Sequence, residues 1–385
     1  MVFEYYSPEE GRFMMEYGII TDEILAELAE IAGPAHVWTA EEKLEACSRD
    51  ETTTLRASER YLPDAVVAPA SAQEVSEILK LANRHVIPVT PRGGGTGLSG
   101  GALPVCGGIV ISDERLNRII EIDAENLVAV TEPGVITSEI NAAAAEKGLA
   151  YTGYPMSVLS CHIGGNIAEN AGGGNAVKYG VTMRYVLGLE VVLPTGEILT
   201  LGGKLMKDVS GYSLKELFVG SEGTLGYVTK IILRLQPLMK NRAALLALFS
   251  DTETAIKAVP KMMAHGGIVP SSIEYIDAYC YRKACGFLNE ELPMSGVEAV
   301  LLGSNQESLD MDIERAGEIL SAEGAAEIYV ADTRSTRERI WSVRRSIDEA
   351  LRLTDPVQAD EDIVVPISRI PEVARGLREI EKKYG

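Results

Sequence analysis

The sequence predicts an α+β protein of two or three domains, and three observations lead to this expectation. The chain has 385 residues, which is more than one domain of ordinary size contains. Its first part combines strand-like segments with three glycine-rich clusters. After Gln236-Pro237 the pattern changes to strand–helix–strand–strand–helix–strand, an order typical of a separate α+β domain.

Helical patterns occur three times in the first part. Thr21 is a start signal for apolar positions that share one helix face, and Gly33-Pro34 ends that run. Ser71 has the features of an N-cap, and Gly148 stops the third helix. The three predicted helices comprise residues 8–32, 72–83 and 137–147.

Strand patterns lie between and after these helices. In the first part they comprise residues 88–90, 108–112, 127–132, 186–193, 198–201 and 226–235. The turn Pro194-Thr195-Gly196-Glu197 predicts that the fourth and fifth of them form a β-hairpin. In the second part we expect strands at residues 243–249, 273–276, 297–303 and 326–330, with helices at residues 252–264 and 309–323.

The segment Pro91–Gly101 carries the first indication of function. Glycine is frequent in it, and successive glycines let backbone N–H groups converge around an anion such as phosphate. It is not a Walker loop, because Gly-Lys-Ser/Thr is missing. It formally matches G-x-G-x-x-G, but Gly101, Pro104 and Gly107-Gly108 forbid the long helix that must follow. We expect a phosphate loop of another kind; a flexible loop without a ligand is the alternative.

Two further glycine clusters follow, at residues 161–174 and 219–228. Each of them lies between strand-like segments. A mononucleotide needs one phosphate loop, whereas three clusters in one domain favour an extended ligand that is lined by backbone. A dinucleotide meets this description, and three unrelated sets of turns are the alternative.

Composition and charge argue against several classes of partner and site. The formal net charge of −20 disfavours nucleic acid and anionic membrane surfaces, which demand a basic footprint. The longest obvious apolar run, Ala243–Phe249, is far shorter than the roughly 20 residues of a membrane span. The N-terminal residues lack the layout of a signal peptide, so we expect a cytoplasmic location. Dispersed cysteines without C-x-x-C and scattered histidines predict no disulfide framework, iron–sulfur cluster or metal site.

Four segments, taken in order, resemble a known family. They read PRGGGTGLSGG, IGGNIAENAGGG, YVLGLEVVLPTGEI and GYSLKELFVGSEGTLGYVTKIILRL. This combination is similar to the FAD-linked oxidases typified by vanillyl-alcohol oxidase. Within that family it most resembles the FAD-binding subunit of glycolate oxidase and the FAD-dependent D-lactate dehydrogenases. The resemblance covers about residues 45–385.

The resemblance implies a two-part α+β FAD-binding domain followed by an α+β cap domain over the isoalloxazine ring, without a Rossmann fold. Residues 1–45 would then be an N-terminal helical segment, residues 46–237 the FAD-binding domain and residues 238–385 the cap or substrate domain. Relatives continue beyond a point equivalent to Gly385 with metal-binding histidines, a glutamate and the catalytic histidine. We expect weak or absent oxidation if the chain is complete, and a divalent metal such as zinc, manganese or iron in a longer parent.

The resemblance also implies cofactor contacts residue by residue. The backbone around the FAD diphosphate would be that of Arg92, Gly93, Gly94, Gly95, Thr96 and Gly97, with the turn continued by Leu98 and Ser99. The diphosphate and flavin would also be lined by Pro155, Ser157, Cys161, Gly164, Gly165, Asn166 and Asn170. The adenosine or ribityl part would lie beside Glu222, Gly223 and Val228.

Several of these positions have alternatives. Cys161 can be a small buried residue, and Glu222 can be a capping or turn carboxylate. Relatives with covalent FAD place a histidine where this chain has Thr96, so we expect non-covalent FAD. His162 stands where many relatives have threonine, and it is either an ordinary loop histidine or a functional one.

A second informative segment contains Trp341 and Arg344, which share one face of a predicted helix. An arginine beside an aromatic ring can bind a carboxylate in a bidentate fork. The family has the same Trp-x-x-Arg arrangement in its cap, so the resemblance implies that Arg344 binds the substrate carboxylate. The alternative is a surface cation with Arg345 as its exposed neighbour. The acids 360–362 match another family segment, and we expect them to be solvated rather than paired with the arginines.

The reaction implied by the resemblance is hydride transfer from C2 of a D-2-hydroxy acid, D-lactate or glycolate, to flavin N5. A base, usually histidine, must take the hydroxyl proton. Electrons would pass to a partner such as an electron-transferring flavoprotein or an iron–sulfur subunit. Two alternatives remain open: a non-catalytic FAD-binding subunit of a larger oxidase complex, and another flavin reaction in the same fold, such as ether-lipid synthesis.

Overall fold

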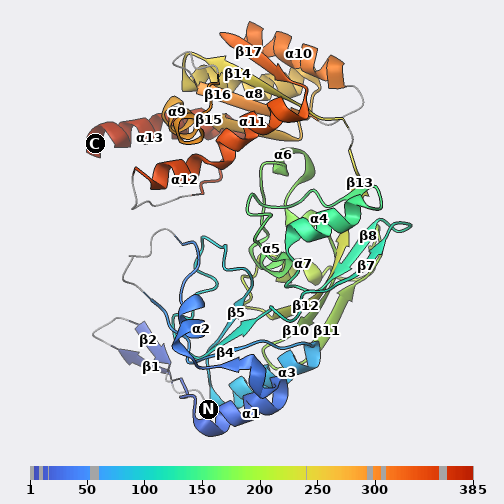
Figure 1. Cartoon of the computed structure of the whole chain (residues 1–385), viewed down its shortest axis with the longest axis vertical. Coiled ribbons are helices and arrows are strands. Elements are labelled where there is room, and N and C mark those ends of the chain that lie inside the picture. Colours follow the sequence, from blue (N-terminus) through green and yellow to red (C-terminus); the bar gives the residue numbers. More distant parts are fainter. Residues whose placement is uncertain are drawn as a thin grey trace. The chain divides into compact units, whose positions relative to one another are not determined.

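The chain divides into two compact units, which we describe separately (Figure 1). The computed structural model describes residues 4–7, 12–15, 17–52, 60–239, 241–292, 298–304, 309–354 and 362–384. Unit 1 comprises Met1–Gly173 and Val181–Leu238, and unit 2 comprises Gly174–Gly180 and Met239–Gly385. The chain therefore enters unit 2 twice, first as a short excursion after the second glycine cluster.

Unit 1 contains a four-stranded sheet from which the first glycine cluster emerges. Its strands lie in the order β3 (Val37–Trp38), β4 (Ala65–Val67), β6 (Ile109–Ser112) and β5 (Val89–Arg92). The last three run parallel, and β3 is antiparallel to β4. The helices around this sheet are α1 (Asp22–Ala32), η1 (Pro34–His36), α2 (Glu41–Ala46) and α3 (Ala72–His85).

Apolar side chains from the helices cover both faces of this sheet. Leu28 of α1, Ile78 of α3 and Ile111 of β6 belong to one buried core. On the other face, Leu44 of α2 packs against a smaller cluster that includes Val110. The Ser71 hydroxyl accepts from the amide three residues later at 3.2 Å, which confirms the predicted N-cap of α3.

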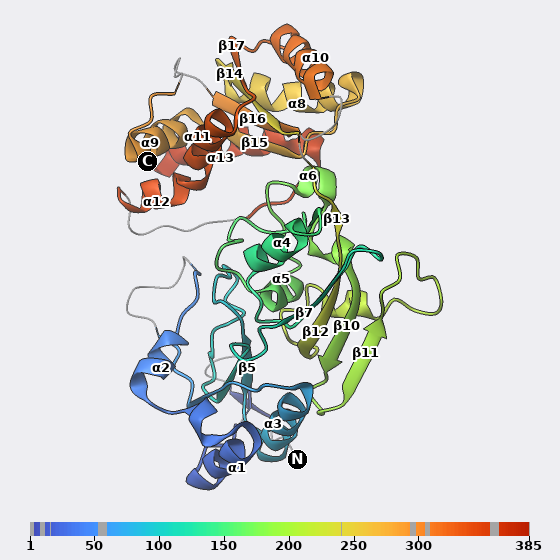
Figure 2. The same ribbon diagram turned by 45° about the vertical axis from the view of Figure 1, so that its right-hand side comes forward.

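Unit 1 also contains a five-stranded antiparallel sheet, and Figure 2 shows β11 and β10 side by side in it. Its strands lie in the order β11 (Ile198–Gly202), β10 (Val186–Val192), β12 (Tyr227–Arg234), β8 (Val128–Thr131) and β7 (Ile119–Asp123). Strands β10 and β11 pair along their length, so the predicted hairpin is confirmed. The unit also includes α4 (Thr137–Ala145), β9 (Leu149–Ala150), α5 (Ile163–Glu169), η2 (Thr182–Tyr185), α7 (Lys215–Phe218) and β13 (Gln236–Pro237).

Unit 2 is built on an antiparallel sheet in the order β15 (Ser272–Ile276), β16 (Glu298–Ser304), β14 (Ala243–Phe249) and β17 (Glu327–Ala331). Its first helices are α6 (Ala176–Tyr179), α8 (Thr252–Gly266), α9 (Ala278–Leu288) and α10 (Leu309–Ala322). They are followed by α11 (Arg334–Arg345), α12 (Ile347–Arg352), η3 (Ile367–Arg369) and α13 (Ile370–Tyr384). The predicted βαββαβ order is confirmed, with α9 as an additional helix between β15 and β16. All seven residues of β14 are buried, so both faces of the sheet are covered there.

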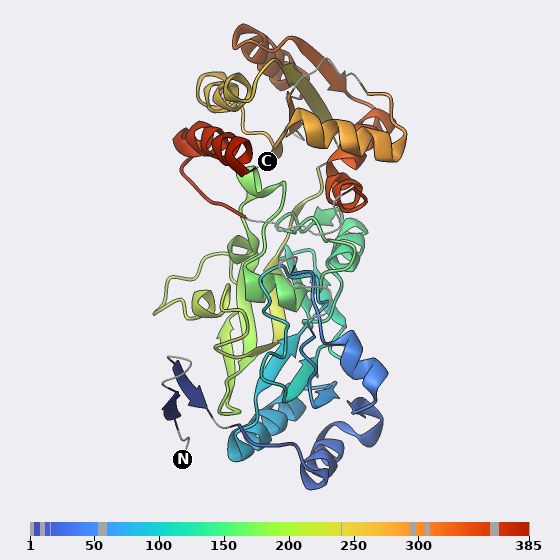
Figure 3. The ribbon, with the colours of Figure 1, turned by 90° about the vertical axis from the view of Figure 1, so that its left-hand side faces the viewer.

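The N-terminal segment 1–45 is less helical than expected. It contains the antiparallel pair β1 (Glu4–Ser7) and β2 (Arg12–Met15), drawn in dark blue in Figure 3, and also β3 of the parallel sheet. The helix predicted over residues 8–32 is reduced to α1, and residues 8–11 and 16 lie outside the described residues.

Two local features explain why α1 begins late. Gly18 donates its amide to the Val86 carbonyl at 2.9 Å, and a Cβ on Gly18 would lie 2.0 Å from the His85 carbonyl oxygen. The chain is thus held against the end of α3 and cannot turn into a helix at this point. Thr21 then caps the helix, because its hydroxyl accepts from the Ile24 amide at 3.5 Å.

Candidate functional site

The first glycine cluster is a loop at the carboxyl end of β5. The Asp113 amide donates to the Arg92 carbonyl at 3.2 Å, which ties the start of the loop to the residue after β6. The Arg92 guanidinium donates to the carbonyls of Ala46 and Ala102 at 3.3 and 3.4 Å. Gly95 has φ +68°, and a Cβ there would lie 2.4 Å from Nη2 of Arg92. The arginine side chain therefore fixes the loop, and the centre of the loop requires glycine.

The second glycine cluster, which leads into α5, packs directly on this loop. A Cβ on Gly94 would lie 2.6 Å from the Ser160 carbonyl oxygen. A Cβ on Gly93 would lie 3.5 Å from the Cβ of His162 and 3.4 Å from Oδ2 of Asp113. The two backbones thus approach each other more closely than side chains would allow.

The third cluster contacts both α5 and β5. The amides of Gly220 and Glu222 donate to two carbonyls of α5, each at 2.9 Å. Gly223 has φ +74°, and a Cβ on it would lie 2.4 Å from Cγ of Pro91 in β5. Glu222 itself has φ +52°, a conformation that costs a residue with a Cβ roughly 1–2 kcal/mol. All three clusters predicted from the sequence therefore meet in unit 1.

Two glycines of this assembly are required by neither backbone conformation nor packing. Gly97 and Gly165 do not have positive φ, and a Cβ on Gly165 would meet nothing within 4 Å. The nearest atom to a Cβ on Gly97 would be Oε1 of Glu169, at 3.9 Å. Gly164 is different, because its Cβ would lie 2.6 Å from Cβ of Pro133. The open positions keep space beside backbone amides, so the assembly fits the diphosphate of FAD.

Three of the predicted cofactor residues use their side chains within the protein. Cys161 and Asn166 are each 3% exposed. The Asn166 amide donates to the Thr137 hydroxyl at 2.8 Å, and the Cys161 thiol donates to the same oxygen at 3.3 Å. Asn170 ends α5 with φ +49°, and its side-chain oxygen accepts from the Met183 amide at 2.9 Å. These side chains hold the second cluster in shape, and the buried-residue interpretation of Cys161 agrees with its position.

The remaining residues that were predicted to contact the cofactor are exposed or half-buried. Leu98 and Ser99 are exposed, and the Ser99 hydroxyl donates to Glu169 at 3.0 Å. The half-buried members are Thr96, Pro155, Ser157 and Val228. The Ser157 carbonyl accepts from the amides of Ser160 and Cys161, both at 2.9 Å, so it shapes the turn before α5.

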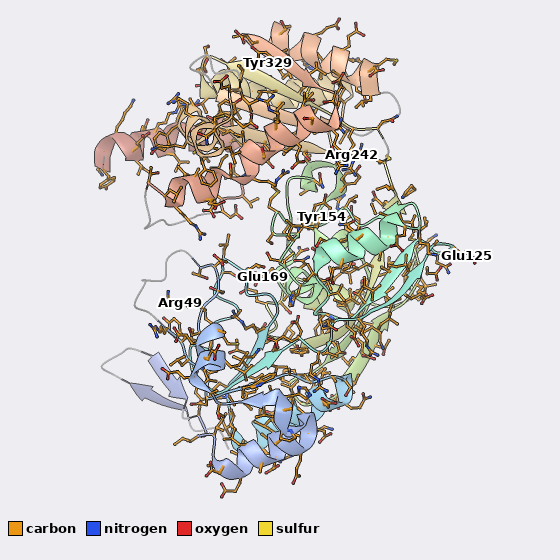
Figure 4. All side chains as sticks on the ribbon, viewed as in Figure 1. Arg49, Glu125, Tyr154, Glu169, Arg242 and Tyr329 are labelled. Carbon is orange, nitrogen blue, oxygen red and sulfur yellow. The ribbon has the colours of Figure 1, made fainter. Side chains whose placement is uncertain are left out.

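Carboxylates gather at the far end of the first loop. A Cβ on Gly101 would lie 3.1 Å from Oε1 of Glu169, which Figure 4 labels, and 3.8 Å from Oε2 of Glu222. Burial raises the pKa of Glu169; the Ser99 hydrogen bond opposes this, and the charges of Glu222 and Asp50 reinforce it. Two carboxyl groups therefore lie at this end of the loop, and no local sequence signal marks Glu169 as one of them.

A buried ion pair lies at the opposite end of the loop. Nδ1 of His162 is 2.8 Å from Oδ1 of Asp113, and the two side chains are 18% and 4% exposed. The pKa of Asp113 is raised, because burial outweighs the opposing hydrogen bond and charge of His162. Burial lowers the pKa of His162, but the bond and charge of Asp113 outweigh it, so this pKa is raised. Asp113 had no sequence signal, because 49 positions separate the two residues.

In unit 2, Arg344 lies in the last turn of α11 with Trp341 one turn before it, as expected. Trp341 packs against the core of the unit. Nε of Arg344 donates to Oε2 of Glu274 in β15 at 2.8 Å, and the two side chains are 32% and 15% exposed. Sequence reasoning missed Glu274. Arg345 is more exposed and pairs with Glu338 of its own helix.

Other expectations concern metals, membranes and acids. Within the described residues, no group of three or more His, Cys, Asp or Glu side chains is placed to hold a metal ion. In the same part of the chain, no helix has both the length and the apolar character needed to cross a bilayer. All five cysteines are free thiols. Of the acids 360–362, the first two lie outside the described residues and Asp362 is exposed.

Comparisons with known proteins agree with this geometry. Residues 63–202 match the family described as FAD binding domain, and residues 238–385 match FAD linked oxidases, C-terminal domain. The glycolate oxidase subunit GlcD of Bacillus subtilis is 38% identical over 95% of this chain and 77% of that protein. A D-lactate dehydrogenase of Anaerostipes hadrus is 36% identical over 95% of this chain and 78% of that protein. The solved structure of an alkyldihydroxyacetonephosphate synthase has the same fold, with TM-score 0.77 and 18% identity over all of this chain and 86% of its own.

Proposed function

The chain belongs to the FAD-linked oxidases of the vanillyl-alcohol oxidase type and is an FAD-linked oxidoreductase, and from this premise we propose that it oxidises a D-2-hydroxy acid to the 2-oxo acid. The observation that carries the cofactor part is the meeting of three glycine clusters around two open glycines, Gly97 and Gly165. The names of the relatives favour D-lactate or glycolate as substrate.

In this proposal FAD is held without a covalent bond, because Thr96 offers no nucleophile of the kind that a histidine would provide. The backbone from Arg92 to Ser99 and the residues Gly164 and Gly165 surround the diphosphate. When bound, FAD supplies the hydride acceptor and the electron-transfer chemistry that no side chain can supply. The protein contributes binding, orientation and electrostatics.

The charge pattern along the first loop supports one orientation of the cofactor. The end near Gly93 carries His162, whose ring can donate a hydrogen bond to an anion. The end near Gly101 carries Glu169 and Glu222, whose carboxylates repel phosphate but can accept hydrogen bonds from sugar hydroxyls. We therefore place the diphosphate at the first end, and a ribose or ribityl chain near the two glutamates.

For the substrate, we assign carboxylate binding to Arg344. Its guanidinium uses Nε for Glu274, which leaves its terminal N–H groups for a carboxylate. Glu274 orients the guanidinium of Arg344. Trp341 packs against the core and thereby holds α11, the helix that carries Arg344. Electrons would leave through a partner protein, either an electron-transferring flavoprotein or an iron–sulfur subunit, and five free thiols are consistent with the cytoplasm.

Two other functions deserve a direct comparison with this one. A non-catalytic FAD-binding subunit of a larger oxidase would need the glycine assembly but not Arg344. Ether-lipid synthesis is suggested only by the likeness to the synthase structure, and at 18% identity that likeness carries the fold alone. A divalent metal belongs to the proposal only for a longer form of the protein.

One experiment separates these possibilities. The purified protein is supplied with FAD under anaerobic conditions, and its visible spectrum is recorded before and after D-lactate, L-lactate or glycolate. Bleaching of the flavin by one of the 2-hydroxy acids supports the oxidase. A bound flavin that none of them bleaches supports the non-catalytic subunit. Failure to bind FAD at all contradicts the cofactor assignment.

A further inference from the structure

His162 occupies an unusual place for an ionisable side chain. Its ring lies beside the buried Asp113 and beside the backbone of the first loop at Gly94, and Asp113 itself lies beside Gly93. A Cβ on Gly94 would lie 3.4 Å from the ring carbon Cδ2. Because Cδ2 is bonded to Nε2, that nitrogen belongs to the edge of the ring on the side of the loop. The opposite nitrogen, Nδ1, faces Asp113 at 2.8 Å.

The pair fixes which ring nitrogen carries a proton. An ionised carboxylate only accepts hydrogen bonds, so Nδ1 of His162 is the donor to Asp113. The described residues offer Nε2 no hydrogen-bond partner, and the side chain retains 18% exposure. Nε2 is therefore available to a ligand in the loop, with its orientation already set by a carboxylate that is almost fully buried.

The charges around the pair favour the doubly protonated ring. The groups that face His162 are Asp113 and Glu114 after β6 and Glu139 of α4, all of which raise its pKa against the effect of burial. The buried Tyr227 of β12 interacts electrostatically with Asp113, and its hydroxyl has no hydrogen-bond partner among the described residues. With three carboxylates nearby and a net charge of −20, this region would repel a diphosphate unless a cation stands between them.

We propose that His162, oriented by Asp113, is a positively charged hydrogen-bond donor to the diphosphate of FAD, so that this chain binds its cofactor more tightly in acid than in alkaline solution. The inference rests on the proposed function, because it needs FAD in the glycine assembly. The His162–Asp113 pair thus makes the affinity for the cofactor depend on pH.

The direction of the dependence follows from linkage. A bound diphosphate stabilises the imidazolium, so the pKa of His162 is higher with FAD than without it. Binding then takes up a proton. The affinity is greatest below the pKa of the free protein and decreases as the pH rises from that value to the higher pKa of the complex. Above both values the affinity is constant again.

The test is a titration of the FAD-free protein with FAD, followed by flavin fluorescence, from about pH 6 to about pH 9. We expect the dissociation constant of the unaltered protein to rise roughly tenfold or more over this range. His162→Gln should bind FAD more weakly at the acid end and show no such rise, and His162→Thr should behave likewise. Asp113→Asn should move the transition to lower pH, because the carboxylate no longer supports the cation.

Two controls make the outcome specific. His85→Gln changes an exposed histidine of α3 in the same unit and should leave the pH profile as it is. Riboflavin, which lacks the diphosphate, should bind with the same affinity to the unaltered protein and to His162→Gln. A dissociation constant for FAD that does not change with pH in the unaltered protein overturns the inference, and so does a pH profile that survives in both His162 variants. Absence of FAD binding at every pH contradicts the proposed function instead.

Discussion

The two units hold their candidate residues in opposite ways. In unit 1 the site is made of backbone, and its shape comes from glycines such as Gly94 and Gly223 that bring three segments within side-chain distance of each other. In unit 2 the candidate is one charged side chain, Arg344, held by Glu274 on a helix that packs on a core. A backbone site should be sensitive to added volume and tolerant of lost charge, whereas a side-chain site should show the reverse.

The largest expected effect tests the backbone site. Gly165→Leu places a side chain in the open space beside the loop, where a Cβ meets nothing within 4 Å. The protein should fold normally, but the affinity for FAD should fall by roughly a hundredfold or more because the ligand and the side chain compete for one space. Flavin fluorescence titration measures the affinity, and circular dichroism checks the fold.

Two neighbouring changes separate ligand space from packing. Gly165→Ala should preserve the fold or stabilise it by up to about 1 kcal/mol, since alanine favours the helix. Gly164→Ala should destabilise the protein by about 1–3 kcal/mol, because the new Cβ would lie 2.6 Å from Pro133. If Gly165→Leu bound FAD like the unaltered protein, the cofactor would not lie where we place it.

The next effect tests the side-chain site. Arg344→Ala should raise the KM for the 2-hydroxy acid that bleaches the flavin by about tenfold to a hundredfold, because a charged hydrogen bond to the substrate carboxylate is lost. The affinity for FAD should change little, because we propose that FAD is held by the backbone of the three glycine clusters and not by the Arg344 side chain. Steady-state kinetics in a form of the protein that is active measures the first quantity.

Variants around Arg344 sharpen this contrast. Arg344→Lys keeps the charge but not the planar fork, so it should recover only part of the loss. Arg345→Ala removes the neighbouring cation and should leave KM unchanged. Glu274→Gln should raise KM less than Arg344→Ala does, because it disturbs only the orientation of the guanidinium. A KM that stays the same in Arg344→Ala would refute the carboxylate role.

The smallest effect concerns the support of the backbone site. Thr137→Val removes the hydroxyl that accepts from Asn166 and Cys161, and it leaves a buried amide without this partner. We expect a loss of about 1–2 kcal/mol in the free energy of unfolding, measured by chemical denaturation. Thr137→Ser keeps the hydroxyl and should lose less. A loss in Thr137→Ser together with unchanged stability in Thr137→Val would show that the methyl group of Thr137, and not its hydrogen bonds, stabilises the second cluster.

Local sequence signals predicted only part of the regular elements, and they gave no sign of β3, β4 and β7 in unit 1 or of α9 in unit 2. The Ser71 cap, the turn before β11 and the βαββαβ order of unit 2 depend on residues that are close in sequence, and each is found where it was expected. For residues 8–32, the helix start at Thr21 and the end at Gly33 are confirmed. The prediction is wrong for the described residues before Thr21, because long-range pairing determines their structure. Gly18 bonds to the end of α3, and no pattern within residues 8–32 reveals that contact.

For the candidate site, the sequence indicated the glycines but not the carboxylates that lie beside them. The clusters could be recognised because close backbone approach requires glycine in almost any fold. The sequence could not reveal the three carboxylates Asp113, Glu169 and Glu274, because the hydrogen-bond partner of each lies far away in the chain. Asn166 and Cys161 lie in the second cluster, but their side chains donate to the Thr137 hydroxyl and do not point away from the protein as free donors.

By itself, the sequence predicted a phosphate-binding backbone and two parts, because glycine content and strand or helix periodicity are local properties of the chain, and its motifs carried the resemblance to the FAD-linked oxidases. Only the tertiary structure decided which glycine is open and which is packed, and which carboxylate stands beside which cation. Gly164 and Gly165 are adjacent and identical in sequence, yet a Cβ on one would strike Pro133 and a Cβ on the other would meet nothing. The difference arises because the segment that contains Pro133 packs against Gly164 and not against Gly165.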